Sequence, residues 1–215
     1  MSFIDKAITV LRNSGIILIP TDTHFALAAD PYSPGAVEKL TLLKRSPCTR
    51  EMTFCFCELA DIWEWVDVSP WQRSKIEMLS RACWPGTLKI SLRKKQRADF
   101  LPGAGDILPV VCVKNSQMRT IISRLGRPLV VIPAGYPQDE GDLVSFTLAR
   151  EDMGDCVDLV VPSNCKNPSR TATSISLCWM TKSRSCVMAS WISVACFDLG
   201  PGDQLLKFVA KAFNA

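Results

Sequence analysis

The segment GIILIP, residues 15–20, constrains the fold of this chain more than any other feature. It is a short, fully apolar run bounded by glycine and proline, a pattern typical of a strand that is buried on both faces. Comparable runs recur over the first two thirds of the chain and alternate with segments whose apolar residues repeat at helical spacing. This alternation predicts an α/β or α+β protein in which helices flank an open sheet.

The same patterns give the positions of the remaining elements. Further strands are predicted over residues 51–57, 87–92, 106–113, 128–132 and 157–161, with extended segments near 171–178 and 186–197. Helices are predicted over residues 4–11, 34–43, 58–66, 70–82, 116–125, 142–149 and 203–213. A loop is predicted to open at residue 21, directly after the first apolar strand, and Ser33-Pro34 is a signature of a helix start.

Length and composition place the chain among globular proteins. Its 215 residues fit one domain, which we predict to span residues 1–215. The chain is 47% hydrophobic and 21% charged, which excludes an intrinsically disordered protein, and the net charge of +4 permits an anionic partner without requiring one. No apolar run approaches the roughly 20 residues of a membrane span, and the first residues lack the layout of a secretory signal. We therefore expect a cytoplasmic protein with no membrane partner.

Cysteine and histidine usage argues against two classes of site. The chain has 10 cysteines but no CxxC pair, and its one histidine is His24. Zinc sites and Ser-His or Cys-His nucleophilic machinery are therefore poorly supported, and no metal ligands are predicted. Cys55 and Cys57 alternate along a predicted strand, so both side chains should lie on one face of the sheet. Buried reduced thiols are the favoured interpretation of this pair, and a metal-binding CxC pair is the alternative.

The polar segment directly after the first apolar strand is the first site candidate. Thr21, Asp22 and Thr23 place two hydroxyls and a carboxylate where a strand ends and a loop begins. In open α/β sheets, ligands bind beyond the carboxyl ends of strands. The alternative is a polar turn in which Asp22 accepts hydrogen bonds from nearby backbone amides.

Clustered cations form the second candidate. Lys44, Arg45 and Arg50 lie within seven residues between a predicted helix and a predicted strand, so they could hold phosphates. The alternative is a solvated helix end that complements the helix dipole. The basic run at residues 93–97 is predicted as a solvated loop, with RNA backbone contact as the minor interpretation. The chain has no Walker P-loop and no GxGxxG motif.

The order and spacing of these segments resemble the YrdC-like family, the threonylcarbamoyl-AMP synthases. The resemblance covers almost the whole chain, and the PTDT and WPG motifs are its most specific parts. The matching segments are PTDTHFAL at 20–27, KRSPCTREM at 44–52, WPGTLK at 84–89, CVKNS at 112–116, IPAG at 132–135 and ATSISL at 172–177. The resemblance implies a twisted, largely mixed sheet with flanking helices and a concave, positively charged cavity.

The resemblance also implies a reaction and its participants. Family members condense L-threonine, bicarbonate and ATP into threonylcarbamoyl-AMP and pyrophosphate, assisted by Mg²⁺, and the product feeds a modification of tRNA. Carried onto this sequence, Thr21 and Thr23 would bind threonine. Lys44 and Arg50 would be the catalytic residues that hold the phosphates, and Thr173 would add a hydroxyl on the nucleotide side.

Several family positions hold different residues here. Two family arginines and the Ser and Asn of a TSAN loop fall on Ser46, Cys112, Pro133 and Gly135. Each missing charged contact would weaken nucleotide affinity about 10–150-fold. Arg45 and Lys114 are the candidate replacements for the missing charge. Catalytic activity therefore stays open: the alternative is an impaired family member that binds RNA or a nucleotide through a basic concave surface.

Overall fold

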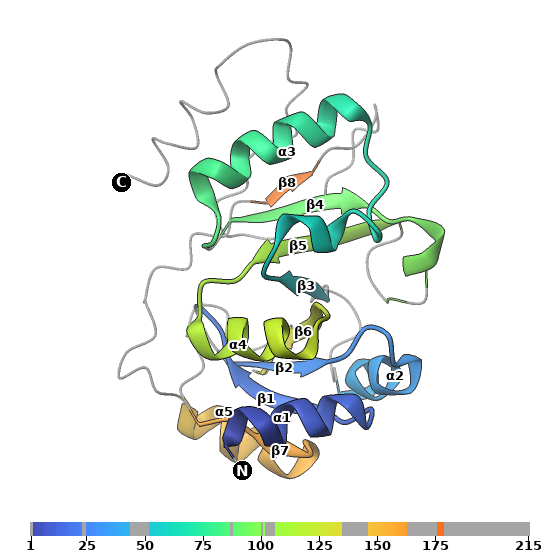
Figure 1. Ribbon diagram of the computed structural model, residues 1–215. Coiled ribbons are helices and arrows are strands. Elements are labelled where there is room, and N and C mark those ends of the chain that lie inside the picture. Colours follow the sequence, from blue (N-terminus) through green and yellow to red (C-terminus); the bar gives the residue numbers. More distant parts are fainter. Residues whose placement is uncertain are drawn as a thin grey trace.

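The computed structural model of the 215-residue chain describes most of its first 162 residues (Figure 1). The described ranges are 2–22, 25–43, 52–86, 88–99, 101, 106–134, 146–162 and 176–178. The predicted extended segment at 186–197 and the predicted helix at 203–213 lie outside them.

Helices and strands alternate through the described residues. The helices are α1 (Phe3–Arg12), α2 (Pro34–Leu43), α3 (Pro70–Cys83), α4 (Ser116–Leu125) and α5 (Phe146–Met153), with 3-10 turns η1 (Leu59–Ile62), η2 (Gln96–Ala98) and η3 (Gly154–Cys156). The strands are β1 (Ile17–Pro20), β2 (Phe25–Ala29), β3 (Thr53–Phe56), β4 (Lys89–Arg93), β5 (Ile107–Cys112), β6 (Leu129–Pro133), β7 (Leu159–Val160) and β8 (Ser176–Cys178). None of the helices in the described ranges is long and apolar enough to cross a membrane.

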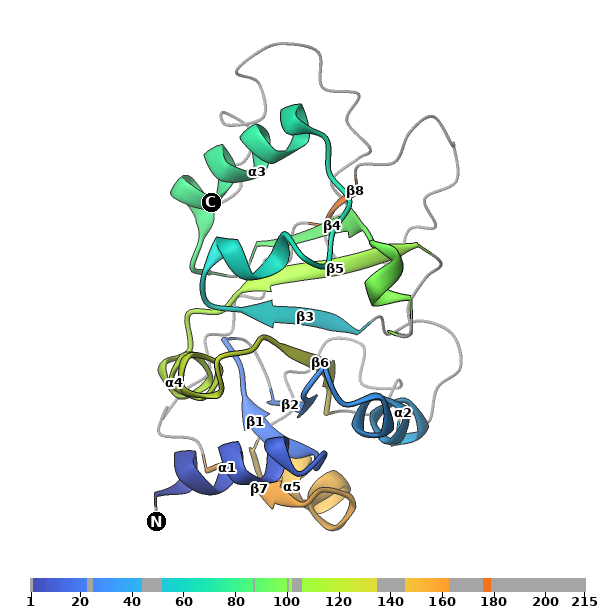
Figure 2. The same ribbon diagram turned by 45° about the vertical axis from the view of Figure 1, so that its right-hand side comes forward.

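The eight strands of the described residues form one mixed sheet with the order β7-β1-β2-β6-β3-β5-β4-β8. Strand β3 pairs with β5 in parallel, whereas β1–β2, β2–β6, β3–β6 and β4–β5 are antiparallel. Figures 1 and 2 show α3 beside β4 at one end of the sheet and α1 beside β1 and β7 at the other. The predicted fold class, a mixed sheet with flanking helices, is confirmed.

The ends of the helices follow capping chemistry that is visible in the sequence. Helix α3 begins after Ser69, whose hydroxyl accepts a hydrogen bond from the backbone N–H of Gln72 at 3.3 Å, and Pro70 fills its first position. Helix α4 ends at Gly126, whose φ of 72° lies in the left-handed region that favours glycine. Local residues therefore fix where these helices begin and end.

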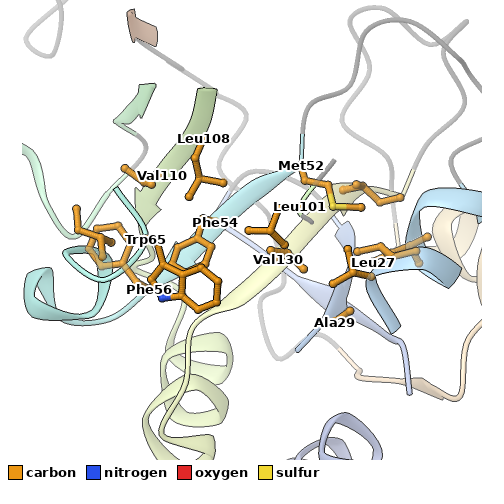
Figure 3. Close-up of a cluster of buried hydrophobic side chains, with 14 of the residues drawn as sticks. Leu27, Ala29, Met52, Phe54, Phe56, Trp65, Leu101, Leu108, Val110 and Val130 are labelled. Carbon is orange, nitrogen blue, oxygen red and sulfur yellow. The ribbon is translucent and has the colours of Figure 1, made fainter. Parts of the chain in front are cut away.

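Buried side chains lie on both faces of the sheet. Alternate residues along β1, β2, β3 and β6 enter different clusters, as the pleat of a strand requires. One cluster, with α2, α3 and η1, contains Leu18, Leu27, Phe54, Phe56 and Val130, and the other, with α1 and α4, contains Ile17, Ala28, Cys55, Cys57 and Val131. Figure 3 shows the first cluster around Phe54 and Trp65, whose ring centroids are 5.0 Å apart.

The sequence patterns missed one strand, and one predicted helix was wrong. Residues 25–29, for which no element was predicted, form β2, a fully buried strand between β1 and β6. Three of its five residues are alanine, which has low strand propensity, so burial against both neighbours rather than local preference makes it a strand. Residues 58–66 were predicted as a helix, but only the short turn η1 forms there before the chain turns again.

Candidate functional site

The chain that leaves β1 meets the chain that leaves β5. The backbone N–H of Lys114 donates to Asp22 Oδ2 at 2.8 Å, although the two residues are 92 positions apart. The side-chain amide of Asn115 donates to the backbone oxygen of Thr21 at 3.3 Å. The predicted threonine-binding segment is therefore held against the start of α4 by a carboxylate and an amide. We call this contact between residues 21–22 and 114–115 the β1–β5 clamp.

Two further segments meet the end of β5. The backbone N–H of Val113 donates to the oxygen of Phe56 at the end of β3, at 3.1 Å. The backbone N–H of Gly86, in the WPG turn, donates to the oxygen of Cys112 at 3.0 Å. The structure thus brings together the PTDT segment, the WPG turn and the CVKNS segment, three of the motifs that the sequence separates by up to about ninety residues.

Asp22 is half-buried, and its environment disfavours the charged form. Burial raises the pKa of its carboxyl above the ordinary value, and the backbone N–H groups of Lys114 and Asn115 partly oppose that rise. The alternative interpretation, a local polar turn, correctly predicted that Asp22 accepts hydrogen bonds from backbone amides. The amide of Lys114, however, lies across the sheet rather than nearby in the sequence.

Replacing Asp22 with asparagine should change how stability depends on pH. Because the pKa of Asp22 is raised above 3.8, the folded protein binds this proton more tightly than the unfolded chain does. The contribution of Asp22 to the free energy of unfolding therefore falls as pH rises from 3.8 through the raised pKa. The free energies of unfolding of the wild type and of Asp22→Asn are measured by urea unfolding at acidic and neutral pH. As pH rises, the stability of Asp22→Asn relative to the wild type should increase. A difference that does not vary with pH contradicts this account.

Asn115 is a site residue that the sequence interpretation missed. It is the N-cap of α4, and its side-chain oxygen accepts the backbone N–H of Met118 at 3.1 Å while its amide reaches Thr21. Its side chain is buried, so both polar ends are used inside the protein. An asparagine immediately before a predicted helix is a capping signature and could have been recognised as one.

Arg119 is the second residue that was missed. Its guanidinium reaches back along α4, so that Nη1 donates to the oxygen of Val113 at 3.0 Å and lies 3.9 Å from Cys112 Sγ. Nη2 lies 3.6 Å from Oε1 of Glu58, whose side chain is mostly exposed. A cation from a helix therefore stands beside Cys112, the position at which the family resemblance implies an arginine. Nothing in the local sequence pattern indicates this contact.

Burial raises the pKa of four cysteine thiols in the described part, those of Cys55, Cys57, Cys83 and Cys112. Cys55 and Cys57 lie on one face of the sheet, which confirms the alternation argument, and both are free thiols. Burial raises the pKa of Cys57 to about 11 and raises that of Cys55 further. In the ranges that the structure describes, no group of three His, Cys, Asp or Glu residues could hold a metal ion. These residues do not by themselves provide a site for Mg²⁺.

The remaining predicted site residues lie outside the described part. Of the predicted set, Thr21 is half-buried at the β1–β5 clamp, whereas Thr23, Lys44, Arg50 and Thr173 fall on residues that the structure does not describe. Their roles stay predictions. Ser46, Gly135 and Arg45, the other positions weighed above, are also outside it, while Cys112 is buried and Pro133 ends β6.

The basic run at 93–97 was predicted as a solvated loop, and all of it except the half-buried Lys94 is exposed, although Arg93 ends β4 and some of its side chains make surface contacts. Lys94 Nζ donates to the oxygen of Leu101 at 3.0 Å, and Lys95 Nζ donates to the oxygen of Trp63 at 2.7 Å. The Arg97 guanidinium pairs with Glu64 at 2.5 Å and lies over the Trp65 ring at 5.1 Å. Three of the four cations of this run therefore also have partners on the protein surface.

The fold and the convergence of these motifs define an α/β protein of YrdC-like architecture. The sequence profile of the Sua5/YciO/YrdC family, which carries the description "Telomere recombination", matches residues 9–187. The chain belongs to this family.

Named relatives agree with that assignment. A threonylcarbamoyl-AMP synthase of Idiomarina loihiensis is 28% identical over 162 residues, which cover 73% of this chain and 86% of that protein. One from Psychromonas ingrahamii is 23% identical over 145 residues, covering 67% and 75%.

Solved structures share the fold. Sua5 of P. abyssi, in complex with L-threonine, gives a TM-score of 0.66 at 20% identity and covers 73% of this chain. This chain spans 45% of that Sua5 chain. E. coli YciO gives a TM-score of 0.63 at 18% identity, covering 73% of this chain and 75% of YciO. At these identities the likeness concerns the fold alone.

Proposed function

We propose that this chain forms threonylcarbamoyl-AMP and pyrophosphate from L-threonine, bicarbonate and ATP. The threonylcarbamoyl-AMP would then be the precursor for a modification of tRNA. The observation that carries the proposal is the family match over residues 9–187, which includes the PTDT, WPG and CVKNS segments that meet at the end of β5. The names of the relatives from Idiomarina and Psychromonas support it. We expect the protein to work in the cytoplasm, with tRNA or another RNA as the downstream partner.

The chemistry of this reaction sets what the site must supply. Adenylate formation cleaves ATP between its α- and β-phosphates, so negative charge on phosphate oxygens must be stabilised as pyrophosphate leaves. We assign this role to Lys44 and Arg50, threonine binding to Thr21 and Thr23, and a nucleotide contact to Thr173. Of these groups, Thr21 belongs to the segment that the β1–β5 clamp holds in place. Mg²⁺, when bound to ATP, would neutralise phosphate charge further.

The test is direct detection of the product. Purified protein is incubated with L-threonine, bicarbonate, Mg²⁺ and ATP labelled in its α-phosphate, and labelled adenylate and pyrophosphate are measured. Product should form only when both threonine and bicarbonate are present. Absence of turnover in a preparation that binds ATP or RNA would overturn the synthase and favour the impaired, nucleotide-binding or RNA-binding alternative.

Replacing Lys44 with alanine should lower the rate of adenylate formation about 10–150-fold, because one charged contact to phosphate is lost. Lys39→Ala is the matched control, since Lys39 is an exposed lysine on α2, the helix that precedes Lys44. The control should retain the wild-type rate. Equal rates in the two variants would remove Lys44 from the catalytic machinery.

A further inference from the structure

The end of β5 lacks the arginine that the family resemblance places at position 112, and the residue there is a thiol. Cys112 is buried, and burial raises its pKa, so the thiol is neutral near neutral pH. A neutral thiol cannot stabilise an anionic ligand as a guanidinium does. If the site at the carboxyl end of β5 binds an anion, the positive charge must come from another residue.

The structure places one such charge beside Cys112. Arg119 lies about one turn into α4, and its Nη1 is 3.9 Å from Cys112 Sγ. The bond from Nη1 to the Val113 oxygen at 3.0 Å fixes the guanidinium at the exit of β5, where the PTDT segment and the WPG turn also arrive. The cation therefore has a defined position beside the site.

Several N–H donors of the Arg119 guanidinium remain available to a ligand. A guanidinium has five N–H donors, and the Arg119 hydrogen bonds within the described residues come from Nη1 alone. Nη2 faces Glu58 at 3.6 Å, which is too long for a hydrogen bond and is an ion pair in contact with water. The Arg119 side chain is one-third exposed, so an incoming oxyanion could displace this loose pairing.

We propose that Arg119 is an oxyanion-binding residue of this site and supplies from α4 the charge that β5 lacks at Cys112. The shared ligand chemistry is a phosphate or carboxylate oxygen pair, which a guanidinium binds through two parallel N–H donors. The substrates of the proposed function offer two sources, the phosphates of ATP and the carboxylate of threonine. The inference rests on the proposed function for these substrates, but its test measures binding separately from turnover.

The primary experiment is calorimetric titration of the full chain with three probes: ATP, inorganic pyrophosphate and L-threonine. Arg119→Ala should lower the affinity for at least one probe about tenfold or more. Loss for ATP and pyrophosphate identifies phosphate as the ligand, and loss for threonine alone identifies its carboxylate. Arg119→Lys should fall between, because it keeps the charge and loses the planar fork. Unchanged affinity for all three probes, or no binding by the wild type, overturns the proposal.

The matched control is Arg124→Ala. Arg124 lies on the same helix but points to Asp5 of α1, with 2.5 Å between Nη2 and Oδ1. Its removal should change probe affinities less than about twofold, since its charge is half exposed and is already paired with Asp5. Urea unfolding of both alanine variants shows whether each is folded under the titration conditions. An equal loss of affinity in both variants would overturn a specific role for Arg119.

Glu58→Gln tests the competition between the ligand and the ion pair. Removing the carboxylate should raise the affinity about two- to fivefold for the probe whose binding depends on Arg119. The reason is that the ion pair with Glu58 no longer competes with the ligand for the guanidinium. Glu77→Gln is the control, since Glu77 pairs with Arg73 on the exposed face of α3 at 3.1 Å. Tighter binding in Glu58→Gln alone supports the proposal, and equal or weaker binding counts against it.

Turnover on the same preparations separates the two proposals. Probe binding that depends on Arg119, with no labelled adenylate formed, overturns the proposed function and leaves the anion site standing. Wild-type turnover and binding in Arg119→Ala overturn the role of Arg119 and leave the function standing.

Discussion

Replacing Phe54 with alanine should lower the free energy of unfolding by about 3–5 kcal/mol. Phe54 is 0% exposed and lies in β3 near the middle of the sheet, where its ring packs against Trp65 with 5.0 Å between centroids (Figure 3). Truncation removes a whole ring from contact with β5, β6 and the chain after η1, and a strand backbone cannot move inward to fill the space. The measurement is urea unfolding followed by tryptophan fluorescence.

Phe3→Ala is the control for this prediction. Phe3 lies at the start of α1 and is 52% exposed, and the Nζ of Lys6 lies 5.7 Å from the centroid of its ring. Its loss should cost less than about 1 kcal/mol, because little apolar surface returns to water. Similar losses in the two variants would show that the Phe54 cluster does not carry the stability of the sheet.

Replacing Trp84 with alanine should cost about 3 kcal/mol and should also weaken the candidate site. The indole packs edge-on against Phe56 with 5.1 Å between centroids, and its Nε1–H donates to the oxygen of Leu88 at 2.7 Å. Both contacts fix the WPG turn, whose Gly86 N–H holds the end of β5. The estimate lies at the lower end of the range for Trp→Ala because Trp84 is only half-buried. Chemical unfolding and substrate titration measure the two effects.

Trp84→Phe separates packing from hydrogen bonding. It keeps an aromatic ring against Phe56 and removes the N–H that reaches Leu88, so it should cost about 1 kcal/mol. An alanine variant no less stable than the phenylalanine variant would show that the ring contact contributes little. The contacts of Trp84 with Phe56 and Leu88 give this residue a structural role.

Several elements could be predicted because local chemistry determines them. Ser69-Pro70 predicts the start of α3, and the continuous apolar run before Pro20 predicts β1. Strand β2 could not be predicted in this way, since an alanine-rich segment has no strand preference of its own. The turn η1 differs from the predicted helix for a related reason: Ile62, Trp65 and Val66 have helical spacing, but they are buried by packing against the sheet.

The candidate site likewise has features that can be read from the sequence and features that depend on tertiary packing. The amino-acid sequence was enough to select PTDT, WPG and CVKNS as candidate segments, because the residue types and order of these short motifs can be read directly. Three contacts became visible only in the folded chain: Asp22 accepts a hydrogen bond from Lys114, Asn115 reaches Thr21, and Arg119 lies beside Cys112. Contacts between residues far apart in sequence depend on strand order and register, which are set by burial of the whole sheet rather than by local preference.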